Sequence, residues 1–227
     1  MMKAPLPRDA GIMRTVAEDL AAALRFLREA RPIIFRMIML ATAFNLVLSS
    51  FVVIGAPVVV TQVLGLSAQL MGLAEGALAL GGLAGGIVAG ALAGRLGLSS
   101  SPAVLAAGSL ASLLVAAACA LPLPPMGSYF LVVASLFLTM ACCTLFSVQA
   151  VAFVQGETPE GLIGKVMALV MAFANCATPF GALAYGWILD TFRGDVPIVV
   201  AGVVVISLIL SLAVRSVIRK GLESDGA

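Results

Sequence analysis

Three polar residues lie inside otherwise apolar segments of the chain and could do chemistry there. Glu75 is the only ionisable residue well inside such a segment, and a charged carboxylate is costly in lipid. It could bind and release a coupling proton or pair with a cationic substrate group. The alternative is an outer-leaflet acid, hydrated by a water-filled vestibule, with no transport role. Asn45 and Asn175 could each hydrogen-bond a substrate, or instead a neighbouring helix.

Other kinds of chemistry find little support in the sequence. The chain has no His, no nucleophile and base pair, and no phosphate-binding loop. Its cysteines lie in apolar runs, where they are interpreted as small buried hydrophobes: Cys119, Cys142, Cys143 and Cys176. We therefore expect no metal and no cofactor, and an enzyme is the least favoured class. The basic residues form no stripe with interleaved aromatics, so no nucleic-acid partner is expected.

The elements that would position these residues are transmembrane helices. Of 227 residues, 62% are hydrophobic and 11% are charged, against about 25% charged in an average soluble domain. A helix of about 20 apolar residues spans a bilayer. Six such stretches run over residues 33–55, 68–94, 102–121, 128–155, 163–189 and 196–215, with Gly55 and Pro57 ending the first. The predicted fold class is an all-α integral membrane protein with six spans.

Basic residues predict how this bundle is oriented. With six spans, both termini lie on one side of the membrane. The basic residues predicted on that same side are Lys3, Arg8, Arg14, Arg25, Arg28, Arg31, Arg36, Arg95, Lys165, Arg215, Arg219 and Lys220. Only Arg193 falls on the other face. Positive charge favours the cytoplasmic side, so both termini are predicted to be cytoplasmic, in the plasma (inner) membrane.

The chain divides into three parts around this bundle. Residues 1–31 form a cytoplasmic segment, the bundle takes residues 32–215, and residues 216–227 form a cytoplasmic tail. Within the first part, Gly11 to Arg31 fit an amphipathic helix on the inner membrane surface. Its apolar stripe contains Val16, Leu20, Leu24 and Leu27.

Small residues recur along the second span. Four glycines form a ladder at i, i+4 spacing, with Gly81 and Gly85 beside them: Gly82, Gly86, Gly90 and Gly94. Such a ladder lets another backbone approach closely, and it could also let two helices slide. Glu75 lies on the same helix face as Gly82 and Gly86. The third and sixth spans carry no such groups and are expected to face lipid.

Two connections carry a family resemblance. Gly90 to Gly97, with Arg95 and Gly97, resembles the C-terminal copy of the major facilitator loop pattern, except that Gly94 replaces its Asp. That replacement removes the charge network of the full motif. The run Glu157 to Leu169 resembles the signature of the enterobactin-exporter-like and macrolide-efflux-like branch. The matching positions there and beyond are Pro159, Gly164, Lys165, Pro179, Gly181, Gly186 and Asp190.

The resemblance covers residues 12–215 and implies the C-terminal half of a twelve-helix transporter. It implies that spans one and four line a central cavity, spans two and five face the other half, and spans three and six face lipid. Partners would be the lipid bilayer, a small-molecule substrate and a second six-helix half. The implied function is export of a small amphipathic molecule, such as a drug or siderophore, by proton antiport.

The expected second half has three possible sources. Another polypeptide supplies it, two copies of this chain pair, or the chain is a truncated product that no longer transports. A truncation or a split gene is favoured over a homodimer. The alternative function is therefore a non-transporting or truncated membrane subunit that pairs with another transporter half.

Overall fold

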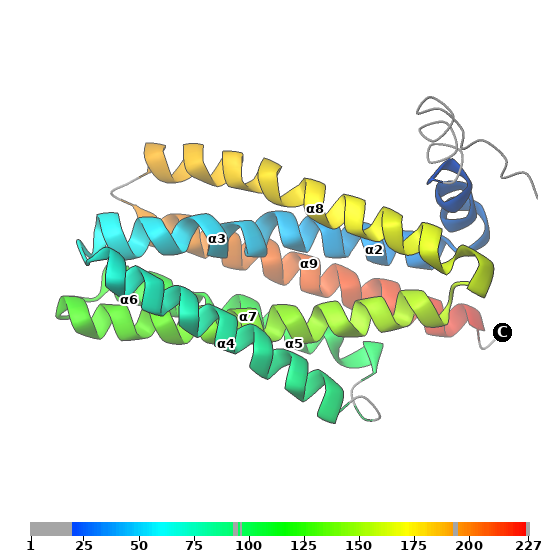
Figure 1. The fold of residues 1–227 in the computed structure, drawn as a ribbon, viewed down its shortest axis with the longest axis horizontal. Coiled ribbons are helices and arrows are strands. Elements are labelled where there is room, and N and C mark those ends of the chain that lie inside the picture. The colour runs from blue at the N-terminus through cyan, green and yellow to red at the C-terminus, as the bar shows by residue number, and fades with distance from the viewer. Residues whose placement is uncertain (1–19, 93–94, 96, 193–194, 226–227) are drawn as a thin grey trace, which may run out of the picture.

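Six long apolar helices make up the computed structural model of the chain (Figure 1). The structure describes residues 20–92, 95, 97–192 and 195–225, and side chains as far as residue 220. Each helix is long and apolar enough to cross a membrane; in order they are Pro32–Val63, Ala68–Ala91, Leu98–Ala120, Pro125–Gly156, Glu160–Thr191 and Val196–Lys220. We refer to them as spans one to six. The predicted all-helical, six-span fold is confirmed.

Some spans contain more than one helical element. Span one joins α2 (Pro32–Phe44), η2 (Asn45–Ser49), α3 (Ser50–Pro57) and η3 (Val58–Val63), where η2 and η3 are π-helical turns. Span three joins η4 (Leu98–Ser100), α5 (Ser101–Ala111) and α6 (Leu113–Ala120). The remaining spans are α4 (Ala68–Ala91), α7 (Pro125–Gly156), α8 (Glu160–Thr191) and, as far as Lys220, α9 (Val196–Asp225).

Two predicted helix ends were wrong. Span one continues past Gly55 and Pro57 through the π-helical turn η3, as membrane helices tolerate proline where local π-helical adjustments satisfy the backbone. The Thr61 hydroxyl also donates to the Pro57 carbonyl (2.6 Å). The chain turns only at Gly65, whose φ of 64° suits glycine. The last helix also continues beyond residue 215, to Asp225.

The positively charged side chains lie at one end of the bundle. The described Lys and Arg side chains all belong to segments at the end where span one begins and span six finishes, on the right of Figure 1. We call this the basic end, and the opposite one the far end. Arg193, the predicted exception, lies outside the described residues.

The bundle is built from two three-helix repeats. Span two packs on span four, and span five packs on span one. Likewise, span three packs on span four, and span six packs on span one, while spans three and six touch each other, as do spans one and four. Each contact made by spans one, two and three thus has an equivalent contact made by spans four, five and six, respectively. Because spans one and four start at opposite ends, the repeats have inverted topology.

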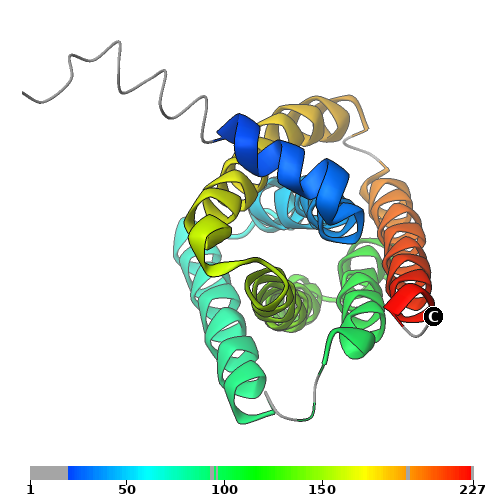
Figure 2. The same cartoon turned by 90° about the vertical axis from the view of Figure 1, so that its right-hand side faces the viewer.

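Spans two and five lie at the rim of this arrangement. In the most apolar window of each, 22% of residues are buried, against 33–39% in the other four spans. Seen from the basic end, α7 occupies the middle of the view, with α4 and α8 at the edge (Figure 2). These two helices therefore keep the most surface available to lipid or to a partner.

A short helix precedes span one and packs on the basic end. It covers residues 20–25 and η1 (Phe26–Ala30), and it crosses the end of the bundle beside the start of α8 (Figure 2). Ala23 and Leu27 are 0% exposed, because they pack against the ends of spans one, four and five. Its apolar stripe thus faces protein here; residues 11–19, including Val16, lie outside the described residues.

Candidate functional site

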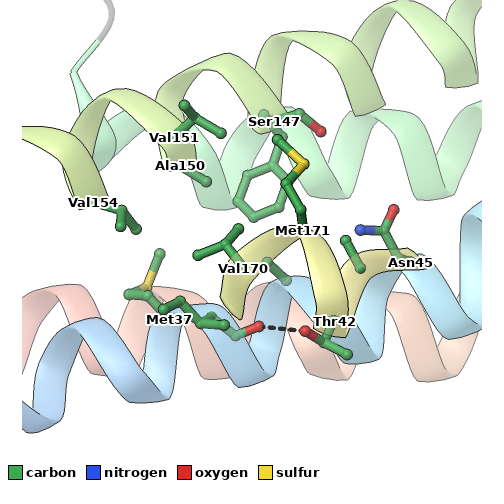
Figure 3. A pocket seen from close by; sticks show the side chains of 13 residues that line it. Met37, Thr42, Asn45, Ser147, Ala150, Val151, Val154, Val170 and Met171 are labelled. Carbon is green, nitrogen blue, oxygen red and sulfur yellow. Dashed lines mark hydrogen bonds between the residues drawn. The ribbon is translucent and has the colours of Figure 1, made fainter. Parts of the chain in front are cut away.

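A cavity of about 160 Å³ lies between spans one, four and five (Figure 3). Its wall is mostly apolar, with the hydroxyls of Thr42 and Ser147 and the amide of Asn45 as polar groups. The lining residues are Met37, Ile38, Ala41, Thr42, Asn45, Phe146, Ser147, Ala150, Val151, Val154, Val170, Met171 and Ala174. An apolar pocket with a few polar groups suits a small amphipathic ligand.

Helix packing at one crossing sets the position of this cavity. Gly181 of α8 lies directly against span one, where a Cβ would meet the Ser50 side chain and, at 2.6 Å, the Leu46 carbonyl oxygen. The Ser50 hydroxyl donates to the Thr178 carbonyl of α8 (3.4 Å). The cavity begins on the basic-end side of this crossing, where Ala174 and Met171 come from α8.

At its basic end the cavity borders the hydrophobic cluster around the short helix. Ile38, Val154 and Val170 line the cavity and also belong to the cluster that holds Leu27. An ion pair lies outside it, between Arg31 and Glu157 (3.0 Å). The short helix therefore packs on the cluster that borders this end of the cavity.

The two candidate asparagines lie in different surroundings. Asn45 is half-buried in the cavity wall, and its Oδ1 accepts a hydrogen bond from the Ser49 hydroxyl at 2.9 Å, within the same span. In Figure 3 its amide lies at one end of the pocket, beyond Thr42 and Met171. Asn175 is exposed on α8 and lies outside the cavity lining. The structure therefore brings only one of them into the cavity.

Glu75 lies away from the cavity, in the part of α4 nearer the far end. It is exposed and borders the α4 face that packs on α7, which includes Ala74 and Met71. Helical spacing places Gly82 and Gly86 on its side of α4. Its carboxylate therefore lies along a strip of small residues.

The glycines of α4 fall into two sets. A Cβ on Gly81 or Gly85 would collide with the carbonyl oxygens of Phe137 and Ala141, so these two make the close contact with α7. At Gly82 a Cβ would find ordinary contacts with α7, the nearest at 3.5 Å, and at Gly86 and Gly90 nothing within 4 Å. Gly94 lies outside the described residues. On α8, Gly181 packs on span one and Gly186 is open.

The loop-motif residues lie at the basic end and do not reach the cavity. Arg95 is exposed in the turn after α4, and Gly97 precedes η4. Pro159 precedes α8 as its N-cap. Gly164 is exposed and Lys165 is half-buried in the first turns of that helix.

Sequence reasoning missed most of the cavity wall. Met37, Phe146 and Met171 are ordinary apolar residues in apolar spans, so only their helix face could have marked them. It also missed buried Gln149 of α7. Its amide donates to Ser100 (3.0 Å) and accepts from Ser101 (2.7 Å), which fastens the start of span three.

Comparison with known protein families agrees with this architecture. Residues 38–225 match the family model described as Major Facilitator Superfamily. Searches of curated proteins and of solved structures found no match. The match spans well over half of the 227 residues and takes in all or most of each of the six spans. The chain therefore belongs to the Major Facilitator Superfamily of membrane transporters.

Proposed function

We propose that this chain forms one half of a secondary transporter that exports a small amphipathic molecule, such as a drug or siderophore, by proton antiport. The observation that carries the proposal is the cavity between spans one, four and five. Apolar walls with Asn45, Thr42 and Ser147 suit a molecule that is partly apolar and partly polar. Support for export comes from the resemblance of Glu157 to Leu169 to efflux transporters.

Glu75 is the proposed proton site. Its carboxylate lies beside the open small-residue strip of α4 and would face the second half if that half packed there. Burial by a partner would favour the protonated form, and exposure would favour release. Opening and closing of the two halves would thus couple to proton binding. Asn45 is the proposed polar contact to substrate, with Asn175 a second contact at the interface between the halves.

The proposed surface for the second half is the open side of α4 and α8. Both spans are the least buried of the six, and Gly86, Gly90 and Gly186 leave room for close helix approach. Either another chain or a second copy would dock there. In this proposal the basic end is cytoplasmic, because positive residues favour that side.

The same open surface favours a second candidate function. A non-transporting or truncated subunit would use α4 and α8 to bind another transporter half without moving substrate itself. Glu75→Gln separates the two functions: antiport fails without the titrating group, whereas assembly on a partner is unaffected.

The test is energised efflux of dyes, macrolides and siderophores from transporter-deficient cells that express the chain. We expect efflux that stops with Glu75→Gln and with a proton ionophore, and that continues with Glu160→Gln. Glu160 is the matched control because it is an exposed carboxylate at the start of α8, away from the cavity. Efflux that survives both Glu75→Gln and the ionophore would refute proton antiport, and no efflux from well-inserted protein would favour the subunit function.

A further inference from the structure

Asn45 presents the donor side of its amide to the cavity between spans one, four and five. Its Oδ1 accepts a hydrogen bond from the Ser49 hydroxyl (2.9 Å), and in Figure 3 its amide nitrogen lies on the side facing Met171. No residue that the structure describes accepts a hydrogen bond from this nitrogen. Its N–H groups are therefore available to a ligand.

The orientation of this amide follows from the hydrogen bonds of the π-helical turn η2. A serine hydroxyl inside a helix can donate to the carbonyl oxygen four residues earlier, which for Ser49 is that of Asn45. That oxygen already accepts from the Ser50 N–H and from the Ser50 hydroxyl (3.2 Å). Because a carbonyl oxygen has two lone pairs, the Ser49 hydroxyl donates to Oδ1 instead, which turns the amide N–H groups toward the cavity.

Thr42 presents the complementary group. Its hydroxyl donates to the Ile38 carbonyl oxygen (2.8 Å), along the dashed line in Figure 3, so only its lone pairs remain for a ligand. Thr42 and Asn45 are three residues apart and so are neighbours on one face of span one. This face of the cavity therefore offers N–H donors and an oxygen acceptor close together, and both groups are uncharged.

The rest of the cavity wall offers no charge. Of the described residues that line the cavity, none is ionisable. An ionised group that left water for this wall would lose its hydration without gaining a counter-ion, which is costly. The volume of about 160 Å³ is close to the ~150 Å³ of a cavity that holds one benzene molecule. The cavity thus suits one ring-sized, uncharged group.

We propose that the cavity receives an uncharged part of the ligand, with an oxygen that accepts a hydrogen bond from the Asn45 amide. Ser49 is the positioning residue that turns this amide to donate. The inference rests on the proposed function, because it takes the cavity as the substrate site. It narrows the substrate class to molecules with a carbonyl, ether or hydroxyl oxygen on a ring-sized neutral group. A molecule whose entering group is an ammonium or a carboxylate falls outside this class.

Three probes of similar size test the proposal on the purified chain in detergent. Para-fluoroacetophenone carries a neutral ketone oxygen, para-fluorobenzylammonium a cation and para-fluorobenzoate an anion, each on one fluorinated ring. Fluorine NMR line broadening, corrected with protein-free detergent, measures binding without transport. We expect the ketone to bind about tenfold more tightly than either ion. Equal or tighter binding of either ion, or no binding of the ketone, would overturn the proposal.

Variants separate the hydrogen bond from the shape of the cavity. Asn45→Leu removes the donors at similar volume, and we expect ketone binding to weaken about tenfold. Ser49→Ala frees the amide to rotate, so a smaller loss of about threefold is expected, which Ser49→Thr restores because it keeps the hydroxyl. The matched control is Gln62→Leu, which removes an exposed amide of span one outside the cavity lining and should bind as the parent does.

The outcomes distinguish this inference from the proposed function. Unchanged ketone binding by folded Asn45→Leu would overturn the role of the amide, and equal losses in Ser49→Ala and Ser49→Thr would overturn that of Ser49. Thermal unfolding of each variant in the same detergent checks folding. A chain that binds the ketone through Asn45 but shows no efflux contradicts only the proposed function. A chain that exports cationic dyes but does not bind the ketone contradicts only this inference.

Discussion

The two glycine crossings of the bundle are related by the internal repeat but leave different amounts of space. Where α4 crosses α7, Gly81 and Gly85 place backbone against backbone on two successive turns. Where α8 crosses span one, Gly181 alone makes the close contact, partly with the Ser50 side chain. The cavity between spans one, four and five borders the second crossing. Beside the first crossing, Thr144 lies next to Gly82 and lines a separate hollow along α7.

The largest expected effect is at the α4–α7 crossing. Gly85→Ala places a methyl group 2.9 Å from backbone atoms of Ala141, which cannot move without shifting the helix. We expect a loss of about 3 kcal/mol in the free energy of unfolding, or roughly 6–12 °C in the melting temperature. Thermal unfolding in detergent measures it.

The control for this variant is the neighbouring glycine. Gly86→Ala meets nothing within 4 Å and gains helix propensity, so it should be neutral or stabilising. Equal destabilisation by both variants would show that the contact between α4 and α7 does not depend on the two backbone contacts.

A smaller effect is expected at the α8 crossing. Gly181→Ala meets the Ser50 side chain and the Leu46 carbonyl oxygen, and we expect a loss of about 2 kcal/mol. Ser50→Gly removes part of the obstruction, so the double variant should be more stable than additivity predicts. A double-mutant cycle on thermal unfolding checks this. Strict additivity would contradict the contact, and no such rescue is possible at Gly85.

The third prediction compares the space beside the two crossings. Ala150 lines the cavity, so Ala150→Leu should cost less than about 1 kcal/mol. Ala89 is 5% exposed on the buried face of α4, and Ala89→Leu should cost about 1–3 kcal/mol. Similar melting temperatures for the two variants would argue against open space beside Ala150.

The smallest expected effect concerns the ion pair between Arg31 and Glu157. The Arg31 and Glu157 side chains are 46% and 38% exposed, so solvent screens their 3.0 Å contact. We expect a coupling of at most about 0.5 kcal/mol between Arg31→Gln and Glu157→Gln in a double-mutant cycle. A coupling several times larger would mean that the pair, rather than burial of Leu27, holds the short helix in place.

The sequence predicted the spans well because apolar length alone defines them. It predicted close helix approach along the α4 glycines, and the structure shows that Gly81 and Gly85 make the contact with α7, while contact of Gly82 and Gly86 with a second half stays a prediction. One residue turns a helix by about 100°, and composition does not say which face meets a partner. The predicted end of span one at Gly55 and Pro57 was wrong, because a membrane helix tolerates proline where π-helical turns satisfy the hydrogen bonds of its backbone.

The cavity was the hardest feature to predict. Among its lining residues, only Asn45 had a polar side chain that stood out in an apolar span, and the others are side chains that any apolar helix carries. Their shared position follows from the packing of α8 on span one at Gly181. A single sequence shows the glycine but not its partner.

Thiol labelling in membranes tests whether the cavity between spans one, four and five holds open space beside α8. Single cysteines are placed at Ala150, in the cavity, and at Met140, beside Gly82 in the α4 crossing, after Cys119, Cys142, Cys143 and Cys176 are replaced by Ala. Only a thiolate reacts, so a water-soluble reagent modifies thiols that meet water. We expect fast modification at position 150 and slow modification at 140. Equal rates at the two positions would contradict open space beside α8.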